Sequence, residues 1–151
     1  MMSLPEIVEQ VMRYPDAPLI VLTGGEPSLW IDEDFVKGLK AMTGKRIAIE
    51  TNGTRPLPHG IDWVTLSPKS GIGNSGDTPM VLTRCDELKV VYLGQDLSQY
   101  NNIEATFRFL QPCWTNDPEK RLHNLAETVQ AVLNHPEWRL SLQTHRILGI
   151  K

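Results

Sequence analysis

Short, continuously apolar segments that end in polar or glycine-rich turns constrain the fold of this chain most. Leu19 to Leu22 is the clearest of these segments, and Gly24 and Gly25 follow it closely. A continuous apolar run of this length is typical of a strand that is covered on both faces, as in a parallel sheet. We therefore expect Leu19 to Leu22 to be a buried strand that leads into a tight turn.

The same combination of strand and turn recurs along the 151 residues. Further strands are predicted over residues 46–50, 63–66, 87–92, 106–110 and 138–142, the last with the alternation of an edge strand. Helices are predicted after Ser3, which forms a capping-box pattern with Glu6, after Asp32 and after Asp117. This order of elements predicts an α/β fold with a mostly parallel sheet, in one domain spanning residues 1–151.

Each predicted helix has an apolar face that we expect to pack against the sheet. In the second helix this face consists of Phe35, Leu39 and Met42. In the third helix it is a longer stripe, made of Leu122, Leu125, Ala126, Val129, Val132 and Leu133. Residues 67–79 are rich in Gly, Ser and Pro, which predicts a long loop.

Charge and composition exclude several classes of protein. The formal net charge is -3 and there is no long basic run, which argues against a nucleic-acid-binding surface. The longest aliphatic run is far too short to span a membrane, and no secretion signal precedes it, so we expect a cytoplasmic protein. The two cysteines, Cys85 and Cys113, form no CxxC pattern and no metal-ligand spacing, which favours buried or incidental thiols.

Polar residues follow the predicted strands at the point where each strand ends. These residues are Thr23 to Glu26, Glu50 to Asn52, Ser67, Lys69, Gln111 and Gln143 to His145. The carboxyl ends of parallel strands meet at one edge of a sheet, where α/β proteins bind their ligands. We therefore expect all of these side chains to line one rim.

Residue chemistry alone leaves two interpretations of each segment on this rim. In Thr23–Pro27 the two glycines allow a close backbone approach and the Glu26 carboxylate suits an ammonium group, but a tight connection with a solvated glutamate has the same pattern. Ser67 and Lys69 suit a carboxylate or hydroxyl ligand, or form an ordinary polar turn. His145 is isolated, and a lone histidine is more often structural than catalytic.

At Thr23-Gly24-Gly25-Glu26-Pro27 the sequence resembles the radical S-adenosylmethionine superfamily, in which a GGE motif at a strand end binds the methionine ammonium group. Further segments make the resemblance more specific, in chain order: Glu50-Thr51-Asn52-Gly53-Thr54, Ser67-Pro68-Lys69, Asp86-Glu87-Leu88-Lys89-Val90-Val91, Phe109-Leu110-Gln111-Pro112 and Arg139-Leu140-Ser141-Leu142-Gln143-Thr144-His145. Together, and over essentially the whole chain, they resemble the 7-carboxy-7-deazaguanine synthase family. GGEP alone is shared by the superfamily, whereas LSLQTH combined with SPK and LQP is much more specific.

The resemblance implies a carbon–nitrogen lyase. In this family a [4Fe-4S] cluster cleaves S-adenosylmethionine, and the resulting 5′-deoxyadenosyl radical removes a hydrogen from 6-carboxy-5,6,7,8-tetrahydropterin. The ring contracts, ammonia leaves and 7-carboxy-7-deazaguanine forms, which leads to queuosine and other 7-deazapurines. The resemblance further implies Mg²⁺ and an electron donor such as flavodoxin, with neither a nucleic acid nor a membrane as partner.

The resemblance also implies roles for individual residues of the rim. Glu26 would bind the ammonium group of the cofactor. The residues implied for S-adenosylmethionine as a whole are Gly24, Gly25, Glu26, Ser67, Pro68, Lys69 and Gln111. The residues implied for the pterin substrate are Thr23, His145 and Lys151.

The CxxxCxxC motif that defines the superfamily has no counterpart in these 151 residues, and neither has the family's first strand nor its Mg²⁺-binding threonine. We therefore expect an N-terminally truncated (β/α) barrel of the radical S-adenosylmethionine type, inactive alone, with Met1 an internal methionine of a longer protein. An exposed sheet edge is expected to lower stability or to pair two copies as a homodimer. Two alternatives remain open: a cluster-free S-adenosylmethionine-binding domain, and an activase for anaerobic ribonucleotide reductase.

Overall fold

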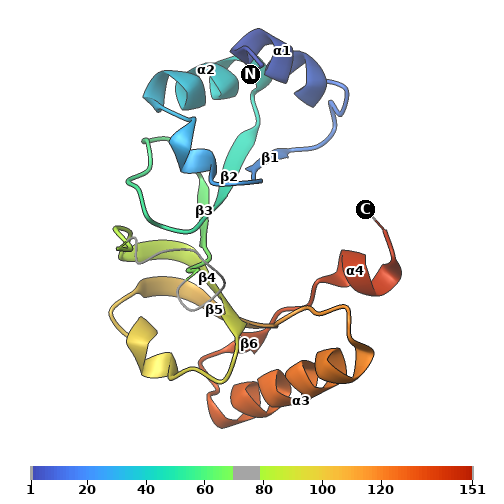
Figure 1. Ribbon diagram of the computed structural model, residues 1–151. Coiled ribbons are helices and arrows are strands. Elements are labelled where there is room, and N and C mark those ends of the chain that lie inside the picture. The colour runs from blue at the N-terminus through green and yellow to red at the C-terminus, as the bar shows by residue number, and fades with distance from the viewer. Residues whose placement is uncertain (1, 70–78, 151) are drawn as a thin grey trace.

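The computed structural model describes residues 2–69 and 79–150, and six strands in them form one sheet. The strands are β1 (Leu19–Leu22), β2 (Arg46–Thr51), β3 (Trp63–Leu66), β4 (Arg84–Tyr92), β5 (Glu104–Pro112) and β6 (Arg139–Leu140). They lie side by side in chain order, and each neighbouring pair is parallel (Figure 1). The described strands form an open, curved sheet with β1 and β6 at its edges, which confirms the predicted α/β fold with the topology of a partial barrel.

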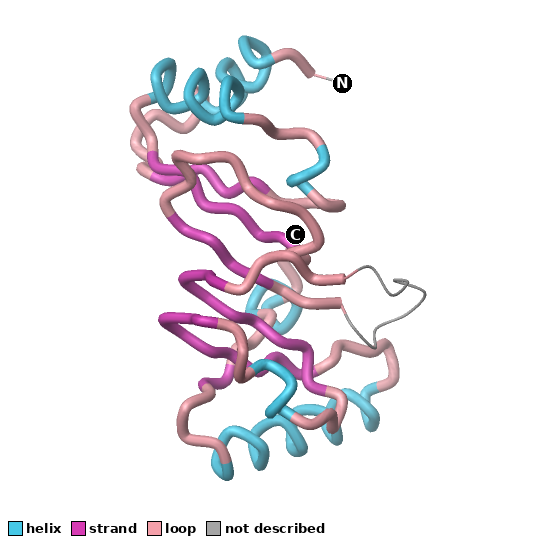
Figure 2. The backbone as a smooth tube through the Cα atoms, turned by 90° about the vertical axis from the view of Figure 1, so that its left-hand side faces the viewer, coloured by secondary structure: helices cyan, strands magenta, loops and turns pink. Residues whose placement is uncertain are grey.

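Helices lie at both ends of this stack of strands (Figure 2). They are α1 (Leu4–Val11), α2 (Glu33–Thr43), α3 (Pro118–Asn134) and α4 (Thr144–Leu148), with 3-10 turns η1 (Pro27–Leu29) and η2 (Leu97–Tyr100). The first two helices pack together beside β1 and β2, while α3 packs beside β5 and β6 (Figure 1). None of these helices is long and apolar enough to cross a membrane.

The predicted helix starts are confirmed. The Ser3 backbone N–H donates to Glu6 Oε2 at 2.6 Å, which is half of a capping box. Asp32 Oδ1 accepts from the Phe35 N–H at 2.8 Å, so Asp32 caps α2. Asp117 caps α3 in the same manner. These starts depend on residues that are neighbours in sequence, which is why they could be predicted.

One face of the sheet carries the hydrophobic core. The register places Leu66 beside Leu88, and Val90 beside Leu110, so that side chains from neighbouring strands form a continuous layer. The larger core cluster extends from β3 to α3 and β6 and consists of Leu66, Cys85, Leu88, Val90, Leu97, Tyr100, Ile103, Leu110, Ala131 and Trp138. The smaller cluster joins α2 to β2 through Val36, Leu39 and Ile47.

The opposite face of the sheet is polar near the carboxyl ends of the strands. The register aligns Glu50 with Thr65, Thr65 with Glu87, and Val91 with Gln111. Because side chains alternate between the faces of a strand, Glu87 and Lys89 also share this face. The helices therefore stabilise the sheet from one side and leave these polar residues available on the other.

One prediction about β1 is wrong. The apolar run Leu19–Leu22 forms a strand, but it is covered on one face rather than on both. Ile20 and Leu22 pack against the smaller core cluster, whereas Leu19 and Val21 are 43% and 49% exposed. The physical reason is position: β1 is an edge strand, and among the described residues the helices beside it cover only one side.

The predicted helix faces are wrong in part. Met42 is 51% exposed, and Val36 takes its place beside Leu39 in the core. In α3 the buried residues are Thr128 and Ala131, whereas Leu122 and Leu133 are 69% and 71% exposed. Thr128 can be buried because its hydroxyl donates to the Asn124 carbonyl at 2.7 Å.

The end of the chain also differs from the prediction. The edge strand predicted over residues 138–142 is confirmed as an edge but contains only Arg139–Leu140. The short helix α4 follows it and ends at Leu148, with Gly149 at φ 67° as its C-terminal cap. A helix of five residues is too short to leave a periodic apolar pattern, so nothing in the sequence predicted it.

Candidate functional site

A polar cavity of about 760 Å³ lies at the carboxyl ends of the strands. All six strands contribute to it, either through residues near their carboxyl ends or through the loops that follow. The residues that line it are Thr23, Gly24, Gly25, Glu26, Glu50, Thr51, Asn52, Thr65, Ser67, Lys69, Lys89, Gln111, Ser141, Leu142, Gln143 and His145. The rim predicted from the strand ends therefore exists as one cavity, except that Thr144 does not line it.

The two glycines after β1 leave one wall of the cavity open. Gly24 and Gly25 have φ values of 88° and 57°, in the left-handed region that favours glycine. A Cβ atom built on either residue would meet no other atom within 4 Å. A ligand can therefore approach the backbone here without displacing protein atoms.

Glu26 is held in place by residues from two neighbouring segments. Its Oε1 atom accepts from the Thr51 hydroxyl at 2.6 Å and from the Ser28 N–H at 3.2 Å. Its Oε2 atom accepts from the Asn52 N–H at 2.8 Å. The carboxylate is thus oriented before any ligand binds.

The pKa of Glu26 lies below the ordinary value for a glutamate. Partial burial raises the pKa, but the hydrogen bonds from Asn52, Thr51 and Ser28 stabilise the charged form and outweigh burial. Glu26 is therefore an anion at neutral pH, which suits an ammonium group.

The SPK segment provides the next wall of the cavity. Ser67 is anchored to β2, because its backbone N–H donates to the Thr51 carbonyl at 2.8 Å. The Lys69 ammonium group donates to the Ser67 hydroxyl at 3.4 Å, and both side chains line the cavity, as does Gln111 from β5. Pro68 is buried and does not line it.

The predicted substrate residues lie at two sides of the same cavity. Thr23 follows β1, and its hydroxyl donates to Glu50 Oε2 at 3.2 Å. His145 is exposed at the start of α4 and lines the cavity from the side of β6. Lys151 lies outside the described residues. The structure therefore brings together Thr23 and His145, which are 122 positions apart in the sequence.

Sequence reasoning missed four residues that line the cavity: Thr65, Lys89, Ser141 and Leu142. Lys89 lies inside β4 rather than after it, so the search for polar residues at strand ends overlooked it. The alternation of Glu87 and Lys89 with the buried Leu88 and Val90 was the available signal, since it places both charges on one face.

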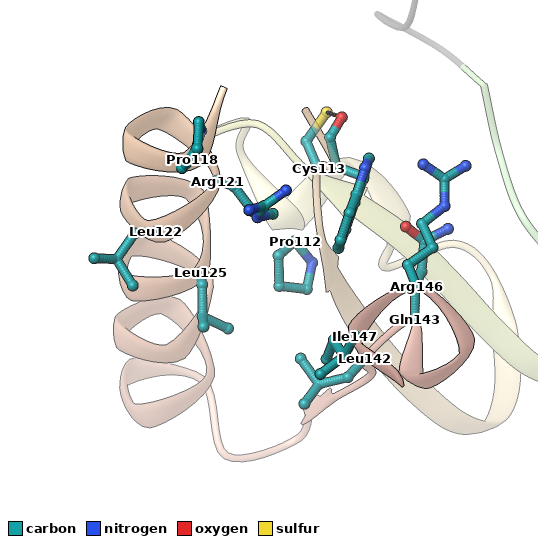
Figure 3. A pocket seen from close by; sticks show the side chains of 11 residues that line it. Pro112, Cys113, Pro118, Arg121, Leu122, Leu125, Leu142, Gln143, Arg146 and Ile147 are labelled. Atoms are coloured by element: carbon teal, nitrogen blue, oxygen red, sulfur yellow. Dashed lines mark hydrogen bonds between the residues drawn. The ribbon is translucent and has the colours of Figure 1, made fainter. Parts of the chain in front are cut away.

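A second cavity, of about 540 Å³, lies between α3 and α4 and is mostly apolar (Figure 3). Leu122 and Leu125 line it from α3, and Ile147 lines it from α4. The guanidinium groups of Arg121 and Arg146 stack on the Trp114 ring, 4.7 and 5.3 Å from its centroid. These contacts hold α4 in place, and with it the two residues Gln143 and His145 that line the polar cavity.

The two cysteines do not fit an iron–sulfur cluster. Cys85 is the second residue of β4 and lies in register with Ala105, whereas Cys113 comes eight residues after Ala105, about 26 Å away at the usual rise of a strand. Burial, together with the nearby Asp86 carboxylate, raises the pKa of the Cys85 thiol to about 11. The chain therefore holds no thiolate set for a [4Fe-4S] cluster.

The described residues do not fit a Mg²⁺ site either. They contain no group of three or more His, Cys, Asp or Glu side chains placed to hold a metal ion. No step that depends on a metal can be assigned to these residues.

No family model matches the chain, but curated proteins do. It is 50% identical over 151 residues to the 7-carboxy-7-deazaguanine synthase of Bacteroides thetaiotaomicron, covering 100% of this chain and 75% of the relative. It is 42% identical over 140 residues to the 7-carboxy-7-deazaguanine synthase of Bordetella pertussis, covering 91% of this chain and 62% of the relative. It is 44% identical over 135 residues to the synthase of Nitratidesulfovibrio vulgaris, covering 88% of this chain and 59% of the relative. The chain thus spans between 59% and 75% of the length of these relatives. It belongs to the 7-carboxy-7-deazaguanine synthase family.

Proposed function

We propose that this chain provides the S-adenosylmethionine- and pterin-binding part of a 7-carboxy-7-deazaguanine synthase. The reaction converts 6-carboxy-5,6,7,8-tetrahydropterin into 7-carboxy-7-deazaguanine with loss of ammonia, as a step toward queuosine and related 7-deazapurines. The observation that carries the proposal is the oriented Glu26 carboxylate beside two glycines that leave the cavity open.

Glu26 has room for the ammonium group of S-adenosylmethionine. A carboxylate offers about four lone-pair positions to hydrogen-bond donors. Thr51, Asn52 and Ser28 use three of them, and Oε2 accepts only from Asn52 within the described residues. The remaining position on Oε2 is the one we assign to the cofactor's ammonium group.

The other cavity residues divide between the cofactor and the substrate. The backbone at Gly24 and Gly25 would contact the methionine part, while Ser67 and Lys69 would contact polar groups of the rest of the cofactor. When bound, S-adenosylmethionine supplies the radical that removes hydrogen from the pterin. This chain's residues bind and orient both molecules.

Since Cys85 and Cys113 cannot hold a cluster together, we propose that the chain alone does not turn over the pterin. The test is a hybrid in which the chain is joined to the part of the Bacteroides thetaiotaomicron relative that it does not match. After anaerobic reconstitution with iron and sulfide, the hybrid is expected to form 7-carboxy-7-deazaguanine, detected by mass spectrometry, and the chain alone to form none. Product from the chain alone, or no product from a hybrid that has bound a stoichiometric cluster, would overturn the proposal.

A second candidate is a cluster-free domain that binds S-adenosylmethionine without cleaving it. The separation of the two thiols favours it. The same hybrid distinguishes the candidates, because a binding domain would yield no deazaguanine in either form. The relatives share one enzyme name, which leaves the activase alternative without support.

A further inference from the structure

We propose that Lys89 is a positioning residue, which holds the Glu50 carboxylate and, through it, the Thr23 hydroxyl in the orientation that the pterin requires. This inference rests on the proposed function, because it assigns the pterin to the side of the cavity where Thr23 lies. Nothing in the strand-end pattern identified Lys89, which lies within β4.

The argument begins with the contacts of Glu50. The Lys89 ammonium nitrogen lies 3.6 Å from Glu50 Oε1, and the Thr23 hydroxyl donates to Glu50 Oε2 at 3.2 Å. Each oxygen of the carboxylate therefore has a different partner, one in β4 and one in the turn after β1. Rotation of the carboxylate would break one contact or the other, so the two partners together fix its plane.

Lys89 is itself held by a second carboxylate. Its nitrogen lies 3.3 Å from Glu87 Oε1, on the same strand and the same face. The side chains of Lys89 and Glu87 are only 24% and 18% exposed, while that of Glu50 is 47% exposed and faces the cavity. The ion-pair chain Glu87–Lys89–Glu50 thus leads from the partly buried sheet face to the open cavity and ends at Thr23.

This arrangement differs from an ordinary surface ion pair. Arg84 and Glu104 lie at the other end of β4 and β5, where their side chains are 81% and 75% exposed and 3.9 Å apart. Such pairs contribute little to stability because solvent screens them. Lys89 is more enclosed, and its loss would leave two carboxylates, Glu50 and Glu87, facing each other without the cation between them.

The consequence for ligands is selective. Glu26, which we assign to S-adenosylmethionine, is oriented by Thr51, Asn52 and Ser28. The ion pairs that Lys89 forms among the described residues are with Glu50 and Glu87, and not with any of these three. Thr23 depends on Glu50, and Glu50 depends on Lys89. Removing the Lys89 ammonium group is therefore expected to weaken binding of the pterin without weakening binding of S-adenosylmethionine.

The test uses calorimetric titration of the full chain with 6-carboxy-5,6,7,8-tetrahydropterin and, separately, with S-adenosylmethionine. Lys89→Met is expected to weaken pterin binding about tenfold, the loss typical of one charge-assisted hydrogen bond, and to leave S-adenosylmethionine affinity within about twofold. Lys89→Arg, which keeps the charge, is expected to restore most of the pterin affinity. Arg84→Met is the matched control, since it removes a cation from the same strand outside the cavity.

A double-mutant cycle separates positioning from direct contact. If Lys89 acts through Glu50, adding Lys89→Met to Glu50→Gln causes no further loss of pterin affinity. If the two losses add, Lys89 contacts the pterin itself and the positioning role is wrong.

A readout without ligand distinguishes a failure of this inference from a failure of the proposed function. The three-bond couplings of the Thr23 methyl group, measured by NMR, report its side-chain rotamer. We expect one rotamer in the wild type, Lys89→Arg and Arg84→Met, and averaging in Lys89→Met. An unchanged Thr23 rotamer in Lys89→Met would refute the inference. A wild type that bound no pterin would instead count against the proposed function.

Discussion

The Thr51 hydroxyl donates a hydrogen bond of 2.6 Å to Oε1 of Glu26. Thr51 is the last residue of β2 and is 3% exposed, whereas Glu26 belongs to the turn after β1. Parallel pairing of the two strands brings their carboxyl ends together, so a buried hydroxyl on one can orient a carboxylate on the other. The position of this carboxylate is therefore a direct result of sheet register.

Thr51→Val is expected to raise the pKa of Glu26. Burial of Glu26 raises the pKa and remains in the variant, while one of the hydrogen bonds that lower it is lost. A ¹³C NMR titration of the side-chain carboxyl group would measure the shift. Thr43→Val is the control: it removes a hydroxyl that donates to the Leu39 carbonyl within α2, and it should leave the pKa of Glu26 unchanged. A Glu26 titration identical in Thr51→Val and wild type would show that the hydroxyl has no part in it.

Asp62→Asn is expected to lower the free energy of unfolding by about 1 kcal/mol near neutral pH. Asp62 accepts from the Lys40 ammonium group and from the Ile47 N–H, each at 2.7 Å. These contacts lower the pKa of Asp62, and the hydrogen bond from Lys40 has the largest effect. A lowered folded-state pKa gives stability that is present above the unfolded-state pKa and is lost as pH falls through the folded-state value.

The difference between wild type and Asp62→Asn should therefore shrink between about pH 5 and pH 3. Urea denaturation at both ends of this range measures it. A constant difference would mean that the amide disrupts packing and that the charge of Asp62 is irrelevant.

Gly53→Ala is expected to destabilise the fold more than Gly44→Ala. Both glycines have positive φ, 78° and 67°, so both substitutions strain the backbone by about 1–2 kcal/mol. A Cβ on Gly53 would also overlap Leu66 Cδ1 in the core, whereas one on Gly44 would meet nothing within 4 Å. Chemical denaturation of the two variants compares the costs, and equal midpoints would exclude the predicted overlap.

Cys85 is expected to react with iodoacetamide at least tenfold more slowly than Cys113 in the folded chain. Cys85 is 8% exposed and has a pKa of about 11 because of burial, so few thiolates are present near neutral pH. Cys113 is only half-buried. Mass spectrometry of alkylated peptides gives both rates, with the unfolded chain as control, in which the two should react alike. Equal rates in the folded chain would contradict the buried position of Cys85.

Helix starts could be predicted from the sequence because their causes are local. Asp32 and Asp117 cap their helices through N–H groups two or three residues away. The polar rim could also be predicted, since parallel pairing alone brings strand ends together. Tertiary packing could not: no local rule shows that α3 turns Thr128 and Ala131 toward the sheet and leaves Leu122 exposed.

Lys89 illustrates the same limit within the site. Its role depends on Glu50, which lies two strands away across β3, and on Glu87 two residues before it. The sequence shows that Glu87 and Lys89 share a face of β4. It does not show that the sheet brings Glu50, in β2, within reach of Lys89. The ligand roles of the rim residues likewise come from family resemblance, and they remain predictions.

Titration of the chain with S-adenosylmethionine, in wild type and Glu26→Gln, tests the central claim most directly. The wild type is expected to bind one equivalent, and Glu26→Gln to bind at least about tenfold more weakly, because the amide loses the charge that attracts the ammonium group. Glu9→Gln, on the exposed side of α1, is the matched control and should bind like the wild type. Equal affinity of Glu26→Gln and wild type would contradict the assignment of this cavity.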